Sequence, residues 1–168
     1  MAREIERKFL IVSDDWRSLV TRKVEIEDGI LAVHEGRKIR VRLCDQKATL
    51  TVKGPRTGLV RDEFEYEIPL QDGRDLISKH RVGEILRKTR YFVPADDGLW
   101  SIDEYHGALT GLFFAEIELA TEDTKIIKPT WVGREITGRK DYSQMSLITK
   151  IRDDGRMDQR YGSDIRSD

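Results

Sequence analysis

Apolar and polar residues alternate with a period of two along much of the chain, which predicts β-strands with one apolar and one polar face. The alternation covers at least six segments: 3–11, 38–44, 48–54, 61–68, 85–92 and 112–119. Turn-forming residues separate these segments, as antiparallel hairpins require. They stand at Glu35-Gly36, at Gly54-Pro55 with Gly58, from Pro94 to Gly98, and from Gly107 to Gly111. We therefore expect a mainly β protein (α+β) built from antiparallel strands.

Helical spacing of apolar residues is confined to three stretches, 14–20, 72–82 and 143–151. They are too few to alternate with the strands, so we expect them to cover the sheet as peripheral helices. Residues 152–168 contain nine charged residues and almost nothing apolar. We expect one domain, residues 1–151, followed by a disordered tail, residues 152–168.

The polar faces of the predicted strands are charged, and the charges are sorted by sign. Acids gather on some strands (Glu4 and Glu6; Glu63, Glu65 and Glu67; Glu116 and Glu118) and bases on others (Arg40 and Arg42; Lys88 and Arg90). An ordinary solvated sheet face is one reading of this pattern. The sorting favours a second one, a closed barrel whose charged face lines a water-filled lumen and whose apolar face packs outside.

The charges expected in such a lumen suit a metal-coordinated polyphosphate. Eight acids (Glu4, Glu6, Glu63, Glu65, Glu67, Asp103, Glu116, Glu118) oppose seven bases (Lys8, Arg40, Arg42, Lys53, Arg61, Lys88, Arg90), a net charge of −1. Two bound divalent cations would bring the lumen to about +3, enough to attract a polyanion. Carboxylates are ligands that Mg²⁺ and Mn²⁺ prefer, and Arg and Lys bind phosphate.

Composition excludes several other classes of protein. The 30 basic and 31 acidic residues nearly cancel, which argues against a nucleic-acid-binding barrel despite Arg37-Lys38-x-Arg40-x-Arg42. A single cysteine, Cys44, excludes an internal disulfide and a zinc ribbon and favours a reducing cytoplasmic location. The N-terminus lacks the apolar run of a signal peptide and no apolar stretch reaches the length of a membrane span, so we expect no membrane association.

The order of the charged pairs resembles the motifs of the CYTH superfamily, also called triphosphate tunnel metalloenzymes. The first strand carries Glu4-Ile5-Glu6-Arg7-Lys8, an ExExK motif that alone would be weak evidence. Over roughly residues 2 to 150 the resemblance continues through Arg40-x-Arg42, Lys53, Glu63-x-Glu65-x-Glu67, Lys88-x-Arg90, Asp103 and Glu116-x-Glu118. Six further motifs in the expected order make the resemblance specific.

The resemblance implies a closed tunnel of eight antiparallel strands that binds triphosphate and a divalent cation, Mg²⁺ or Mn²⁺. It implies metal ligation by Glu4, Glu6, Asp103, Glu116 and Glu118, with Glu63 and Glu65 in support. It implies phosphate binding by Lys8, Arg40, Arg42, Lys53, Arg61, Lys88 and Arg90, and catalytic roles for Lys8, Glu6 and Glu118. One metal would hold the triphosphate while a second activates water. The chain is similar in length to short bacterial inorganic triphosphatases, which implies hydrolysis of inorganic tripolyphosphate.

The chain departs from the family pattern at two positions. Ile30 stands where members of this short group commonly carry an aromatic residue, often Tyr, and Asp141 stands where Arg is usual. Lys8 would then lack a tyrosine partner. Alternative functions are an adenylate cyclase or a thiamine triphosphatase of the same superfamily, or a non-catalytic module that binds polyphosphate or nucleoside triphosphates. A monomer and a homodimer are both open.

Overall fold

The computed structural model describes residues 3–154. This part of the chain forms nine strands: β1 (Arg3–Ile11), β2 (Arg22–His34), β3 (Arg37–Cys44), β4 (Lys47–Lys53), β5 (Val60–Ile68), β6 (Leu86–Ala95), β7 (Gly98–Tyr105), β8 (Phe113–Glu118) and β9 (Val132–Glu135). Its helices are α1 (Leu70–His80) and α2 (Gln144–Asp154), with short 3₁₀ helices η1 (Asp15–Leu19), η2 (Gly107–Leu109) and η3 (Lys140–Tyr142). Within residues 3–154, no helix has both the length and the apolar character needed to cross a bilayer.

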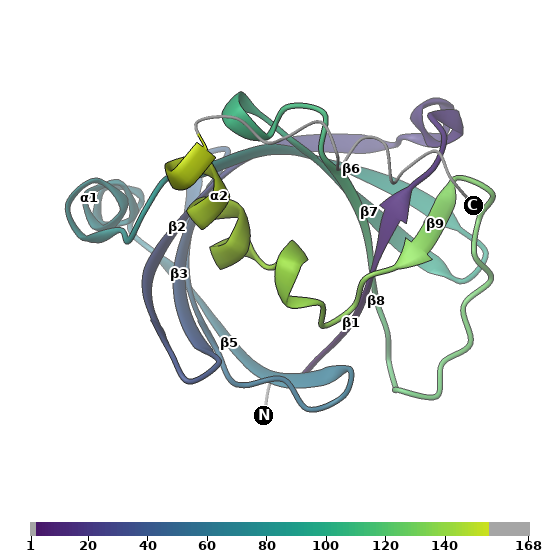
Figure 1. The fold of residues 1–168 in the computed structure, drawn as a ribbon, viewed down its shortest axis with the longest axis horizontal. Coiled ribbons are helices and arrows are strands. Elements are labelled where there is room, and N and C mark those ends of the chain that lie inside the picture. The colour runs from purple at the N-terminus through teal and green to yellow at the C-terminus, as the bar shows by residue number, and fades with distance from the viewer. Residues whose placement is uncertain (1–2, 155–168) are drawn as a thin grey trace.

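Eight of the strands form a closed antiparallel barrel (Figure 1). Their order is β5-β4-β3-β2-β6-β7-β8-β1, and β1 closes the ring by pairing with β5 at Arg3↔Asp62, Glu4↔Arg61 and Ile5↔Val60. β9 pairs with the C-terminal part of β1 as an additional strand. The predicted eight-stranded barrel is confirmed. The six segments of clear alternation correspond to β1, β3, β4, β5, β6 and β8, so that β2 and β7 complete the ring.

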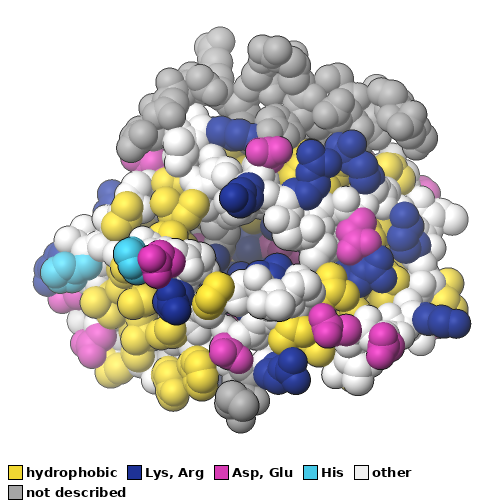
Figure 2. All heavy atoms as spheres, turned by 60° about the horizontal axis from the view of Figure 1, so that its bottom comes forward, with side chains coloured by type: hydrophobic (Ala, Val, Ile, Leu, Met, Phe, Trp, Pro, Cys, Tyr) yellow, Lys and Arg dark blue, Asp and Glu magenta, His cyan; other side chains and the backbone are white. Residues whose placement is uncertain are grey.

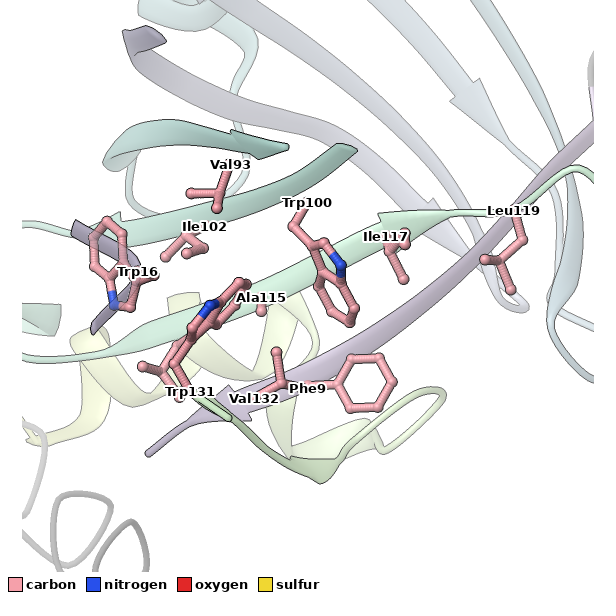
Figure 3. Packing of buried hydrophobic residues seen from close by; sticks show 11 residues of the cluster. Phe9, Trp16, Val93, Trp100, Ile102, Ala115, Ile117, Leu119, Trp131 and Val132 are labelled. Atoms are coloured by element: carbon pink, nitrogen blue, oxygen red, sulfur yellow. The ribbon is translucent and has the colours of Figure 1, made fainter. Parts of the chain in front are cut away.

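The outer face of β1, β7 and β8 is covered by an aromatic core (Figure 3). Trp16 of η1 and Trp131, just before β9, pack on this face together with Trp100 of β7. The rings of Trp100 and Trp131 meet edge to face with centroids 5.5 Å apart. All three indole side chains are almost fully buried, so this outer face of the barrel is covered by a hydrophobic core. The charged face of the same strands therefore points into the lumen.

α1 covers a different part of the outer face, over β2, β3 and β4. The prediction of a helix over 72–82 is confirmed, but the helix begins at Leu70 and ends at His80. The helix approaches the sheet closely at Gly73, where a Cβ atom would lie 2.5 Å from Cβ of Ala48 and 3.1 Å from a methyl carbon of Leu43. Glycine at this position therefore sets the distance between helix and sheet.

α2 lies across one end of the barrel (Figure 1). Its Leu147 and Ile148 are buried against Leu10, Ile30 and Phe114, whose side chains share the strand face that carries the charges elsewhere. One end of the lumen is thus filled by an apolar plug. We expected this helix to cover the outside of the sheet, and instead it closes an end of the barrel. α2 continues to Asp154, beyond the predicted end at 151. Residues 155–168 of the predicted disordered tail lie outside the described residues.

Candidate functional site

The remainder of the lumen is a cavity of about 750 Å³. Twelve basic and six acidic side chains line it, and Figure 2 shows Lys and Arg around and within the central hollow. The sequence alone missed five of the bases, namely Arg3, Lys38, Arg56, Arg139 and Lys140. The lumen is therefore electropositive before any cation binds, in contrast to the net charge of −1 counted from the sequence.

Strands β6, β7 and β8 form what we call the first wall of the lumen. Asp103 of β7 is fully buried, and its carboxylate accepts two hydrogen bonds from Arg90, at 2.7 and 2.8 Å, and one from Lys88. Arg90 also donates to Glu116 Oε2 at 2.7 Å, and Lys8 Nζ lies 3.2 Å from Glu116 Oε1. These five predicted site residues form one continuous ion-pair network, and the four that reach the cavity surface are held in place by it.

Strands β3, β4 and β5 form the second wall, which faces the first across the lumen in the strand order. Lys53 Nζ contacts Glu4 Oε1 at 2.7 Å and Glu63 Oε2 at 2.9 Å, and Arg61 also donates to Glu4. Arg40 lies 3.5 Å from Glu65 and 3.9 Å from Glu63. The predicted residues of this wall are brought together as well. Glu67 lies farther along β5, where it contacts Lys47 outside the cavity lining.

Asp28 is a buried carboxylate that the sequence did not single out as a site residue. It lies on β2 between the two walls, and its side chain has no exposed surface. Arg42 donates to both of its oxygens, at 2.7 and 2.9 Å, and Gln144 of α2 donates to Oδ2 at 2.9 Å. Asp28 therefore fixes Arg42 as Asp103 fixes Arg90. Among the alternate positions 26, 28 and 30 of β2, Asp28 is the one charged residue, and a single acid between two isoleucines of the same face is a weak signal.

Glu6 differs from the other acids because its charge is poorly compensated. Burial, with the charges of Glu116 and Glu4, raises the pKa of Glu6 to about 7. Arg56 is the base that contacts it, with Nη2 3.7 Å from Glu6 Oε1. In the register of β1 and β8, Glu6 lies opposite Glu118, which also lines the cavity and is more exposed than Glu6. The two predicted catalytic acids, Glu6 and Glu118, thus lie side by side on the cavity wall.

Burial and charge shift the pKa of several other groups in directions that follow from these contacts. Lys8 and Arg90 hold the pKa of Glu116 well below its usual range despite its burial. Burial lowers the pKa of Lys88 to about 8, although Asp103 favours the charged form. Asp103 and Glu116 raise the pKa of the Arg90 guanidinium. The first wall therefore combines a permanent cation with a lysine that titrates near neutral pH.

The two departures from the family pattern lie at the plugged end. Ile30 is fully buried beneath α2, and Lys8 Nζ lies 4.2 Å from the ring centroid of Phe114 instead of a tyrosine hydroxyl. The aromatic ring stabilises the ammonium through a cation–π interaction. Asp141 is exposed on η3 and does not line the cavity. Its neighbours Arg139 and Lys140 do, so basic groups are present at this edge of the lumen.

The acidic side chains of the lumen have the chemistry of a site for a hard cation. Glu4, Glu6, Glu116 and Glu118 offer oxygen ligands from the adjacent strands β1 and β8, which suits Mg²⁺ or Mn²⁺ better than softer metals. The raised pKa of Glu6 shows that negative charge already accumulates there. Within residues 3–154, however, no three acidic, histidine or cysteine side chains are grouped closely enough to coordinate an ion. The carboxylates contact Lys and Arg instead.

Comparison with known proteins gives one family and two relatives that carry the same name. The model of the CYTH domain family matches residues 2–152. An inorganic triphosphatase of Acetivibrio thermocellus is 36% identical over 148 residues, covering 88% of this chain and 94% of the relative. An inorganic triphosphatase of Nitrosomonas europaea is 31% identical over 152 residues, covering 88% and 98%.

Solved structures share the fold. A crystal structure of an inorganic triphosphatase superposes with a TM-score of 0.61 at 30% identity, covering 86% of this chain and 97% of that one. A putative adenylate cyclase from Bacillus halodurans reaches a TM-score of 0.54 at 17% identity, covering 73% and 84%. At that identity the second likeness concerns the fold alone.

Proposed function

The chain belongs to the CYTH domain family, and on that premise we propose that it is a metal-dependent triphosphatase acting on inorganic tripolyphosphate. The observation that carries the proposal is the lumen itself, in which basic side chains reach the cavity from two facing walls. A linear polyanion that enters such a lumen meets phosphate ligands along its whole length.

The basic side chains are preorganised for this substrate. Arg42 and Arg90 each donate two hydrogen bonds to one fully buried aspartate, Asp28 or Asp103, which fixes the plane of the guanidinium. Groups fixed in this way stabilise the charge that develops in phosphoryl transfer without reorganising during the reaction. Asp103, which lies behind Arg90 and does not line the cavity, acts in this view through the bases it holds.

Proton transfer would involve Glu6. In the metal-free lumen the pKa of Glu6 is about 7, so its carboxyl group can take up and release a proton near neutral pH whenever it does not hold the cation. Lys8, held between Glu116 and the Phe114 ring, presents its ammonium to the substrate and neutralises phosphate charge. The α2 plug limits access of water from one end of the lumen, so that the charged groups act in a confined space.

The metal proposed for this site is Mg²⁺ or Mn²⁺, with Glu4, Glu6, Glu116 and Glu118 as the residues that would hold it. Such an ion neutralises phosphate charge and lowers the pKa of bound water. We also propose a cytoplasmic location, because Cys44 is the single cysteine of the chain and forms no internal disulfide, as is common for proteins of reducing compartments. Monomer and homodimer remain alternatives.

The test is phosphate release from tripolyphosphate, ATP and thiamine triphosphate, with Mg²⁺, with Mn²⁺ and in excess EDTA. We expect the highest kcat/KM for tripolyphosphate and almost no release in EDTA. Arg90→Met should abolish most turnover, whereas Arg134→Met, at an exposed position of β9, should not. Cyclic nucleotide formation from ATP would instead identify a cyclase, preference for thiamine triphosphate would identify that triphosphatase, and binding without turnover would identify a non-catalytic module.

A further inference from the structure

Lys38 differs from every other buried base of the described cavity in having no carboxylate partner. Lys8, Arg40, Arg42, Lys53, Arg56, Arg61, Lys88 and Arg90 each have a carboxylate oxygen within 4.0 Å. Lys38 is partly buried on β3, and its Nζ instead donates to the amide oxygen of Gln144 at 2.5 Å. An ammonium group has three donors, so the contact with one neutral acceptor leaves the charge of Lys38 uncompensated.

The surroundings of Lys38 add positive charge. In the register of β3 and β4, Lys38 lies directly opposite Lys53, and like charges in this position destabilise a strand pair. Burial, together with the charges of Arg40, Lys53 and Arg61, lowers the pKa of Lys38 well below its usual range. Four bases thus converge at one end of the second wall. The acid that partly offsets them at Lys38 is Asp28, which is already paired with Arg42, as Glu4 and Glu63 are with Lys53.

Gln144 explains why this arrangement is stable in the folded protein. It is the first residue of α2, and its amide NH₂ donates to Asp28 Oδ2 at 2.9 Å while its oxygen accepts from Lys38. The donor contact fixes which way the amide points. Gln144 therefore holds the ammonium of Lys38 in the lumen through a hydrogen bond to a neutral oxygen, which does not neutralise the charge. A carboxylate at this position would neutralise it.

We propose that Lys38 is a further phosphate ligand, the subsite for the unsubstituted end of an inorganic polyphosphate, on the second wall opposite Lys8 and Glu116. This inference rests on the proposed function and names the group that favours an inorganic substrate. When the γ-phosphoryl group of a nucleoside triphosphate reacts beside Lys8 and Glu116, the group placed at Lys38 is its esterified α-phosphoryl group. That group carries less negative charge than the second free end of tripolyphosphate. A lysine with no carboxylate partner gains most from the more highly charged group.

The experiment compares wild type with Lys38→Met and Lys38→Arg in phosphate release from tripolyphosphate, with ATP as a competitive inhibitor so that its affinity is measured even where its turnover is slow. We expect Lys38→Met to raise KM for tripolyphosphate about tenfold or more, to change kcat less than about threefold, and to change the inhibition constant of ATP less than about threefold. Lys38→Arg should restore most of the loss. Lys23→Met, at an exposed position of β2, is the matched control.

Gln144→Glu provides a second test that keeps Lys38 in place. A carboxylate would neutralise Lys38 and repel the phosphoryl group, so we expect KM for tripolyphosphate to rise again with a smaller effect on ATP. Equal losses for both ligands, or an unchanged KM in Lys38→Met or in a folded Gln144→Glu protein, would overturn the inference. Wild-type protein that releases no phosphate from tripolyphosphate would contradict the proposed function instead, so the two failures are distinguishable.

Discussion

Glu6 on β1 lies directly opposite Glu118 on β8, so that two carboxylates enter the lumen from neighbouring positions. The next lumen-facing pair along the same two strands joins Lys8 to Glu116. Like charges opposite each other destabilise an antiparallel pair, whereas opposite charges stabilise it. The repulsive pair Glu6–Glu118 thus lies next to the compensated pair Lys8–Glu116. A cation bound at the repulsive pair would stabilise the folded protein most.

The first prediction concerns the stability of the metal-free protein as a function of pH. The pKa of Glu6 is raised from 4.5 to about 7, so between these pH values the folded state keeps a proton that the unfolded state loses. Glu6 therefore destabilises the fold increasingly as the pH rises through this window. We expect the stabilisation by Glu6→Gln to grow by up to about 1.4 kcal/mol per pH unit and to level off above pH 7. Urea denaturation in EDTA measures it, and an equal effect at pH 5 and pH 8 would contradict the raised pKa.

The second prediction separates the two faces of β8. Glu116 contacts Lys8 and Arg90 in the lumen, so Glu116→Gln should reduce turnover about a hundredfold and also destabilise the metal-free protein, because two bases lose their counter-charge. Ile117 is buried in the outer core, so Ile117→Thr should cost about 1 to 3 kcal/mol while kcat of the folded protein survives. Thermal melts and steady-state kinetics on both variants decide. The opposite pattern would mean that Ile117 faces the functional site and Glu116 does not, so that the two faces of β8 are wrongly assigned.

The third prediction distinguishes two roles of Asp103. Its carboxylate is occupied by Arg90 and Lys88, so Asp103→Asn should raise KM for tripolyphosphate and lower stability, while the Mg²⁺ concentration for half-maximal activity stays unchanged. The measurement is a metal titration at saturating substrate. A large shift of the metal requirement would instead support the ligand role that the family resemblance implies for Asp103.

The fourth prediction concerns the contact between α1 and the sheet. Helix propensity alone would make Gly73→Ala stabilising by about 1 kcal/mol. The added Cβ would lie 2.5 Å from Ala48 Cβ, and neither atom can move without displacing backbone, so we expect a lower melting temperature. Ser78→Ala on the exposed side of the same helix should be neutral or slightly stabilising. A stabilising Gly73→Ala would show that α1 is free to move outward.

Most of the strands that could be predicted carry several charges on the lumen face; β4, with Thr49, Thr51 and Lys53, carries one charge and two hydroxyl groups. On β1, Ile5 and Phe9 lie on the opposite face to Glu4, Glu6 and Lys8, because one face meets water and the other meets the outer core. β2 gave no such signal, because Asp28 is its lone lumen charge between Ile26 and Ile30, and both isoleucines are buried. The other acids of this strand, Glu25 and Glu27, lie on the outer face opposite Thr89 and Arg87, so β2 alternates in the opposite sense to the strands with a charged lumen face.

The plug and its contacts depend on residues far apart in the chain. Lys38 and Gln144 are separated by 106 positions, and no local pattern predicts that an amide of α2 reaches a lysine of β3. A partial signal existed. Leu10 continues the lumen face of β1 beyond Lys8, and Phe114 precedes Glu116 on that of β8. Such a change from charged to apolar on one strand face indicates that something apolar fills that end.

Synthesis of the chain proceeds from the N-terminus, so both walls of the lumen leave the ribosome before α2 does. Until residues 144–154 follow, the mouth of the barrel presents Leu10, Ile30 and Phe114 to water, a ring of apolar groups that α2 later buries. Incomplete chains that end before this helix should therefore be recognised by chaperones and proteases as unfinished. The same helix that closes the lumen therefore also removes from water the apolar groups that quality-control factors bind.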